Sequence, residues 1–236
     1  MSKPFHFKEF SVSQDKTAMK IGTDGVLLGA WAKVNQAFSI LDIGTGTGVI
    51  ALMMAQKSNA EIIDAIELDD SAYEQAVDNF ENSDWGDRLF CYHASLLEFA
   101  EEIEDKYEVI VSNPPFYTDA YKTDNEERNK ARFEDSLPFE HLIHGVTSLL
   151  EENGNFYVII PYKEESNFIS LAKKHGLFLQ NCCRVKGNEN AEFKRSLLQF
   201  SFKDSTANFE TLTIEIERHK YTQEYINLVK DFYLKM

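Results

Sequence analysis

The stretch that decides the fold is Leu41-Asp42-Ile43-Gly44-Thr45-Gly46-Thr47-Gly48, which lies where a strand-like run gives way to a helix-like one. Glycines at such a turn let the backbone bend tightly and let a ligand approach closely, because no Cβ atom intervenes. The spacing is GxGxG, since Val49 stands where dinucleotide-binding folds carry their third glycine. The turn therefore predicts a ligand-binding α/β fold and opposes a nicotinamide dinucleotide as the ligand.

Strand-like and helix-like runs alternate from this turn onward, which is the pattern of βαβ units and a parallel sheet. We expect strands near 38–43, 61–67, 88–93, 107–112, 155–160, 177–185 and 196–203. We expect helices near 49–56, 71–80, 139–150 and 163–175. Ser71 is placed to cap the second of these helices, and Asp69 and Asp70 are either solvated or alternative caps. In the tail, alternating Leu212, Ile214 and Ile216 predict a further strand, and 225–235 predicts a closing helix.

The length and the hydrophobic fraction of 43% suit one domain with small additions. We expect residues 38–236 to form this domain and residues 1–37 to pack on it as an N-terminal segment. No stretch approaches the roughly eighteen uninterrupted apolar residues of a membrane-spanning helix, and the first residues lack the apolar run of a secretory signal. We therefore expect no membrane partner and a cytoplasmic location, with the three cysteines as thiols.

Two carboxylates indicate which ligand the glycine turn holds. Asp42 precedes the first glycine by two positions, where it would repel a pyrophosphate but attract a cationic group. Glu67 ends the second expected strand, where a carboxylate can accept both hydroxyls of a ribose. S-adenosylmethionine carries a sulfonium, an ammonium and a ribose, so we predict it as the cofactor. The residues predicted to hold it are Asp42, Gly44, Thr45, Gly46, Gly48 and Glu67, with Ser95 near the adenine ring.

A second motif, Ile110-Val111-Ser112-Asn113-Pro114-Pro115-Phe116, ends the fourth expected strand. Its prolines stiffen the chain and push Asn113 to an extended conformation, which presents the Asn113 side-chain oxygen and the Pro114 carbonyl as two acceptors. Two acceptors can bind both N–H groups of a planar amino group and aim the nitrogen lone pair at a methyl donor. Phe116 would stack on a planar substrate. We predict Asn113, Pro114, Pro115 and Phe116 as the catalytic residues of methyl transfer to such a nitrogen.

The net charge of −15 opposes RNA as the substrate, since affinity for phosphates comes largely from Lys and Arg. Local basic patches can override the global sign. We predict Arg128, Lys130 and Arg132, in the long charged stretch after the second motif, as contacts to substrate phosphates. His141 and His144 share a helical face, but no cysteine or carboxylate–histidine set accompanies them, so we expect no metal site.

Phe5, Phe7 and Phe10 alternate with polar residues, which suits either a half-buried edge strand or an aromatic–basic surface for RNA. We expect burial for two of the three rings.

The two motifs together resemble the class I amino-methyltransferases across about 38–203. Further stretches are similar to the bacterial tRNA1(Val) (adenine-37-N6)-methyltransferases: Phe5–Phe10, Gln14–Lys16, Ala18–Trp31, Arg128–Arg132 and Lys194–Leu198. The resemblance implies a Rossmann-like α/β fold, with a seven-stranded, mostly parallel sheet whose last strand is antiparallel and with helices on both faces. It also implies S-adenosylmethionine as methyl donor and Thr23 and Asp24 near the cofactor. Ser95 departs from the aspartate often found at its position.

The implied substrate is a structured tRNA, whose adenine beside the valine anticodon is turned out of its stack and methylated on N6. Three alternatives stay open from the residues alone. The acceptor motif also suits a protein glutamine N5-methyltransferase, although such enzymes usually carry a separate helical domain first, and an rRNA guanine-N2 methyltransferase. A non-catalytic cofactor-binding module would leave Asn113 dispensable. The sequence does not indicate an oligomeric state.

Overall fold

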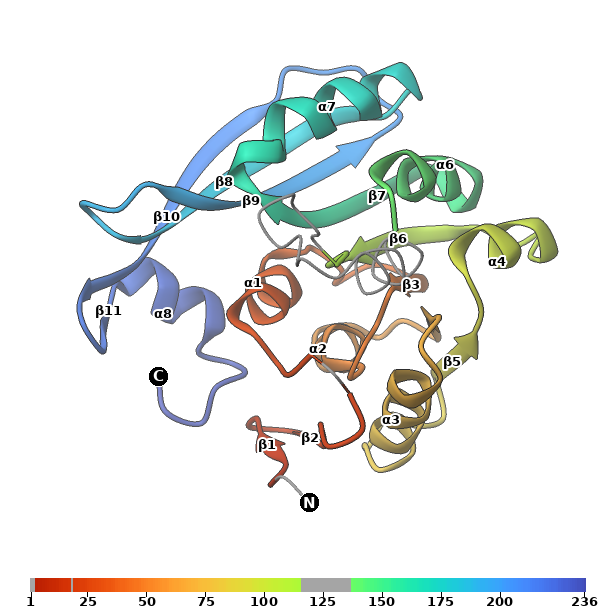
Figure 1. The fold of residues 1–236 in the computed structure, drawn as a ribbon, viewed down its shortest axis with the longest axis horizontal. Helices are drawn as coiled ribbons and strands as arrows, with labels where there is room; N and C mark the ends of the chain where they lie inside the picture. Colours follow the sequence, from red (N-terminus) through yellow and green to blue (C-terminus); the bar gives the residue numbers. More distant parts are fainter. Residues whose placement is uncertain (1–2, 18, 116–136) are drawn as a thin grey trace, which may run out of the picture.

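The computed structural model describes residues 3–17, 19–115 and 137–236 (Figure 1). The strands of its main sheet are β3 (Ser39–Ile43), β4 (Ile62–Glu67), β5 (Leu89–His93), β6 (Tyr107–Ser112), β7 (Leu150–Pro161), β8 (Phe178–Asn188), β9 (Phe193–Ser201), β10 (Asn208–Glu217) and β11 (Lys220–Tyr221). The helices are α1 (Thr23–Trp31), α2 (Val49–Lys57), α3 (Asp70–Glu81), α4 (Leu96–Glu102), α6 (Phe139–Leu149), α7 (Glu165–Lys174) and α8 (Gln223–Val229), with the 3₁₀ turn η2 (Tyr162–Glu164).

The main sheet has the strand order β11-β10-β8-β9-β7-β6-β3-β4-β5. From β5 to β7 every pairing is parallel, while β9 runs antiparallel to both β7 and β8. The alternation of elements and the antiparallel last strand of the seven are thus confirmed. The expected count of seven is wrong, because the tail strand β10 pairs in parallel with β8 and carries β11 beyond it. This described sheet therefore has nine strands.

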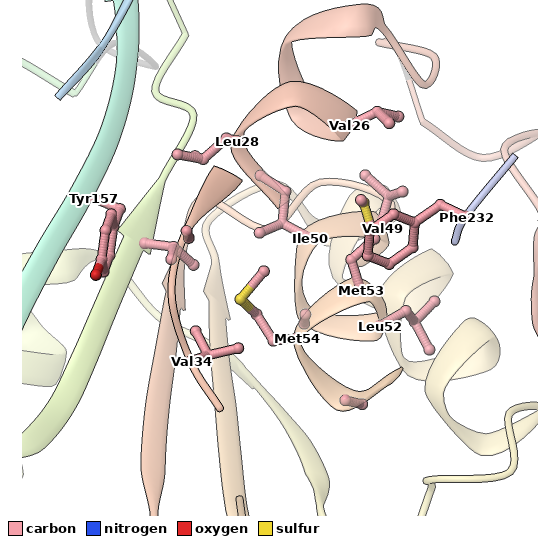
Figure 2. Close-up of a cluster of buried hydrophobic side chains, with 14 of the residues drawn as sticks. Val26, Leu28, Val34, Val49, Ile50, Leu52, Met53, Met54, Tyr157 and Phe232 are labelled. Carbon is pink, nitrogen blue, oxygen red and sulfur yellow. The ribbon is translucent and has the colours of Figure 1, made fainter. Parts of the chain in front are cut away.

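Helices cover both faces of the sheet, as expected. On one face α1, α2, α3 and α8 pack against inward side chains of the strands, and on the other face α4, α6 and α7 do so. Figure 2 shows part of the first core, to which α1 contributes Val26 and Leu28 and α2 contributes Ile50 and Met54. None of the described helices is long and apolar enough to cross a membrane.

Helix ends differ from expectation where several capping residues compete. Asp69, not Ser71, caps α3, and its Oδ1 accepts a hydrogen bond of 2.8 Å from the Ala72 amide. Aspartate and serine are about equally good N-caps, so their order along the chain does not decide between them. The closing helix α8 is shorter than expected and ends at Val229.

The last turn of α1 is held by a lysine from the next helix. Lys57 donates to the carbonyls of Gly29 and Ala30 at 3.0 and 2.9 Å. A cation at this place satisfies carbonyls that lack partners within the helix and opposes the negative end of the helix dipole. Burial lowers the pKa of Lys57 to about 8.

The N-terminal residues contact the main domain through aromatic rings. β1 (Phe5–His6) and β2 (Ser11–Val12) form an antiparallel pair. Phe7 and Phe10 are buried and their ring centroids lie 4.6 Å apart, while Phe5 is half-buried, so the expected burial of two rings is confirmed. Phe7 also stacks on Tyr233 near the C-terminus. All three cysteines are free thiols, as expected.

Candidate active site

The glycine turn joins β3 to α2 in a backbone conformation that only glycine adopts readily. Gly44, Gly46 and Gly48 have φ angles of +69°, +58° and +80°, in the left-handed region where a Cβ atom is strained. A Cβ on Gly48 would also lie 2.5 Å from Cε1 of Phe80. The GxGxG spacing therefore follows from the path of the chain, with each glycine at a position that requires it.

Side chains from three elements hold this turn. Asp42 Oδ2 accepts from Thr45 Oγ1 at 2.6 Å and from the Ala51 amide at 3.2 Å. Glu67, at the end of β4, accepts from the Gly46 amide at 2.8 Å. From α3, Asn79 donates to the Thr47 carbonyl at 2.8 Å. The turn is therefore preorganised by its own surroundings, which lowers the cost of binding a ligand there.

Asp42 is fully buried, and its Oδ1 has no hydrogen-bond partner among the described residues. Burial raises the pKa of this carboxyl to about 7, and the nearby charge of Glu67 acts in the same direction. A buried, incompletely satisfied carboxylate is stabilised by an approaching cation. The charge of Asp42 therefore favours a cationic ligand at the turn, which agrees with the sign inferred from the sequence.

A cavity of about 220 Å³ opens at the carboxyl ends of β3, β4, β5 and β6, the edge at which parallel α/β sheets bind ligands. It brings together five of the predicted site residues: Gly44, Glu67, Ser95, Pro114 and Pro115. Leu68, which follows β4, and Leu96 and Leu97 of α4 supply apolar walls, which suit a planar ring. Three of the residues predicted to bind a cofactor, Gly44, Glu67 and Ser95, thus share one cavity with the prolines of the second motif.

Ser95 lies in this cavity wall and also begins α4. Its Oγ accepts from the Glu98 amide at 3.3 Å, and the Glu98 carboxylate accepts from the Ser95 amide at 3.1 Å. This reciprocal capping box stabilises the start of α4, which is a structural reason for a serine at position 95. The adenine contact assigned to Ser95 stays a prediction.

Asn113 follows the last residue of β6 and lies beside the glycine turn. Ser112 pairs with Ile43 across β6 and β3, and its Oγ donates to the Ile43 carbonyl at 3.0 Å. The next residues, Asn113 and Gly44, therefore leave the sheet at the same level on neighbouring strands. Asn113 is half-buried, and no hydrogen bond joins its side chain to another described residue. Its amide can accept hydrogen bonds from a substrate in front of the turn.

The start of α1 packs beside the start of α2, since a Cβ on Gly25 would lie 3.5 Å from Val49 Cγ1. Thr23 and Asp24, at the start of α1, therefore lie on the side of α2 that follows the glycine turn, and their expected place near the cofactor stays a prediction. Thr23 is exposed, while Asp24 Oδ2 accepts from Nε of Arg195 on β9 at 2.7 Å. No local pattern in the sequence indicates a contact between residues so far apart in the chain.

Two further placements bear on the sequence predictions. His141, expected on a surface helix, lines the cavity from the first turn of α6. Phe116, Arg128, Lys130 and Arg132 lie outside the described residues. Among the residues that the structure does describe, no group of three or more side chains could hold a metal ion.

Comparison with known proteins decides the family. The model of the methyltransferase small domain matches residues 17–176. The chain belongs to the methyltransferase small domain family. Within it, the chain is 61% identical to a tRNA1(Val) (adenine(37)-N6)-methyltransferase of Flavobacterium johnsoniae, over 98% of this chain and all of the relative. It is 57% identical to the protein of the same name from Christiangramia forsetii, over all of this chain and 99% of the relative.

A solved structure shows the fold of this methyltransferase independently. A protein from Agrobacterium tumefaciens, described as a predicted O-methyltransferase, aligns with a TM-score of 0.67 at 17% identity, over 89% of this chain and 96% of that one. Methyltransferases of this family depend on S-adenosylmethionine. The site fits this cofactor, because the orphaned Asp42 Oδ1 offers negative charge to a cation and Glu67 ends β4 within the cavity.

Proposed function

We propose that this methyltransferase transfers a methyl group from S-adenosylmethionine to the exocyclic N6 of adenine 37 in a valine tRNA, in the cytoplasm. The full-length similarity to relatives named for that reaction supports the substrate. The observation that supports methyl transfer is the position of Asn113 beside Gly44, just beyond the carboxyl ends of the neighbouring strands β6 and β3. Residues 38–236 form the catalytic domain in this proposal, and residues 1–37 are a segment that packs on it.

The predicted cofactor residues contact different parts of S-adenosylmethionine in this proposal. The turn from Gly44 to Gly48 approaches the methionine part closely, while Asp42 supplies the negative charge that its ammonium and sulfonium require. Glu67, whose carboxylate accepts from the Gly46 amide, would hold the ribose hydroxyls. Thr45 holds Asp42 in place through the hydrogen bond from its hydroxyl. In this proposal Ser95 contacts the adenine of the cofactor, and Thr23 and Asp24 at the start of α1 also lie near the cofactor.

The acceptor residues position the nitrogen. When bound, S-adenosylmethionine supplies a methyl group activated by its positive sulfur. The Asn113 side-chain oxygen and the Pro114 carbonyl accept from the two N–H groups of adenine N6, which draws the nitrogen towards tetrahedral geometry and aims its lone pair. Pro115 keeps this corner rigid, and Phe116 stacks on the base. The adenine must leave its stack to reach them.

The substrate's phosphates are contacted by Arg128, Lys130 and Arg132 in this proposal. Such contacts give a chain of net charge −15 a local positive surface for RNA.

The test is Asn113→Ala, compared with Asn227→Ala, which removes an exposed asparagine from α8. Loss of a preorganised polar contact at a reacting group should lower methyl transfer to tRNA by about 100-fold or more. Because Asn113 is assigned to the substrate, the Kd for S-adenosylmethionine by calorimetry should stay within about twofold. A normal methylation rate for Asn113→Ala would contradict the assigned chemistry.

A further inference from the structure

Asn79 of α3 is a buried amide that binds two separate segments of the chain. Its side chain is only 3% exposed. Its Oδ1 accepts from the Ser13 amide at 2.9 Å, and its Nδ2 donates to the Ser13 carbonyl at 2.9 Å. The same Nδ2 donates to the Thr47 carbonyl of the glycine turn at 2.8 Å. Both N–H groups of the amide and its oxygen are therefore used.

The hydrogen bond from Asn79 to the Thr47 carbonyl fixes the last peptide of the glycine turn, between Thr47 and Gly48. The Thr47 carbonyl belongs to the peptide that enters Gly48, whose φ angle is +80° and which packs against Phe80, the neighbour of Asn79. Thr47 is 5% exposed, so its carbonyl has little access to water as a replacement partner. The orientation of this peptide decides where α2 begins and where the turn presents its amides to a ligand.

Gln75 lies one turn earlier on α3 and shows the contrast. It is 1% exposed and accepts from the amides of Asp15 and Lys16, both at 3.0 Å. No hydrogen bond connects Gln75 to the glycine turn among the described residues. Asn79 and Gln75 thus hold the same N-terminal stretch on the same helix, but only Asn79 continues to the cofactor turn.

We propose that Asn79 is a positioning residue for S-adenosylmethionine: it holds the Thr47–Gly48 peptide of the glycine turn, and Ser13 fixes the orientation of its amide. This inference rests on the proposed function in assuming that the turn holds the cofactor. The N-terminal segment then takes part in cofactor binding without touching the cofactor, because Ser13 supplies two of the three hydrogen bonds of Asn79.

The test compares Asn79→Leu with Gln75→Met, each of which replaces a buried amide by an apolar side chain of similar size. For Asn79→Leu, loss of the bond to a buried carbonyl should raise the Kd for S-adenosylmethionine about tenfold. At saturating cofactor the rate of methyl transfer and the KM for tRNA should stay within about twofold, because no acceptor residue has changed. For Gln75→Met, the Kd should stay near the wild-type value although the protein loses stability.

Asn79→Asp is the second variant if the leucine disturbs folding. It keeps the acceptor for the Ser13 amide but places an oxygen against the carbonyls of Ser13 and Thr47, so the Kd should rise as well. An unchanged Kd in both Asn79 variants, or an equal rise in Gln75→Met, would overturn the inference. Wild-type protein that fails to bind S-adenosylmethionine would overturn the proposed function itself, and this inference with it.

Discussion

Replacing Asp42 by asparagine should stabilise the cofactor-free protein at high pH while weakening its hold on S-adenosylmethionine. The carboxylate is fully buried, and its Oδ1 has no hydrogen-bond partner among the described residues. Asparagine can keep its oxygen in the place of Oδ2, which accepts from Thr45 and Ala51. The variant therefore removes the charge and leaves the two hydrogen bonds that hold the turn.

The magnitude follows from the pKa of Asp42, which burial raises from 3.8 to about 7. Between these two values the folded protein keeps a proton that the unfolded chain releases. The stability contributed by this proton is fully present below about pH 4 and is lost as the pH rises through about 7. Each pKa unit corresponds to about 1.4 kcal/mol, so the wild type should lose about 3 kcal/mol from this group between pH 5 and pH 8.

The assay is urea unfolding of wild type and Asp42→Asn at pH 5 and pH 8, without cofactor. Other groups titrate in both proteins, so the difference between the free energies of unfolding of wild type and variant isolates the contribution of Asp42. That difference should shift by about 3 kcal/mol in favour of the variant at pH 8. Calorimetry at pH 8 should show about tenfold weaker binding of S-adenosylmethionine by the variant, because a cation loses its buried partner. A stability difference that is the same at both pH values would refute this reasoning.

Three more predictions address the turn, the helices and the RNA. Lys57→Met should lower the free energy of unfolding by about 2 kcal/mol in urea, because buried carbonyls at the end of α1 lose their donor. Gly48→Ala should abolish measurable binding of S-adenosylmethionine in calorimetry, because its φ of +80° and the ring of Phe80 both oppose a Cβ. Replacing Arg128 and Arg132 by alanine should weaken tRNA binding in filter assays and flatten its dependence on salt.

Matched controls separate these effects from general damage. Lys33→Met changes an exposed lysine and should leave the urea midpoint unchanged. Gly22→Ala adds a Cβ where no atom lies within 4 Å and should leave cofactor binding unchanged. Equal losses in a variant and its control would contradict the first two predictions, and unchanged tRNA affinity at low salt would remove the two arginines from the RNA interface.

The glycine turn and the alternation of elements could be predicted because both are local. A strand, a turn and a helix each leave their own periodicity in a short window. The strands β10 and β11 show where this stops. Leu212, Ile214 and Ile216 indicate a strand, but its partner β8 is chosen by packing across the chain, so the number of strands in the sheet could not be read from the sequence.

Some features of the site could likewise be predicted from the sequence, and others could not. Asp42, Gly44, Glu67 and Asn113 lie at or just beyond the carboxyl ends of strands. Parallel strands bring these ends together, so the proximity of the four residues could be inferred. The contacts of Asn79 and Arg195 join residues far apart in the chain and leave no local pattern. They became visible only with the fold.

The proposed activity is methyl transfer to one tRNA adenine. The most direct measurement is transfer of radiolabelled methyl from S-adenosylmethionine by the purified protein onto total RNA and, separately, onto protein from a strain that lacks this enzyme, followed by nucleoside analysis and mapping. We expect label in RNA as N6-methyladenosine at position 37 of a valine tRNA. Label in N2-methylguanosine or in protein glutamine, with none in tRNA adenine, would contradict it.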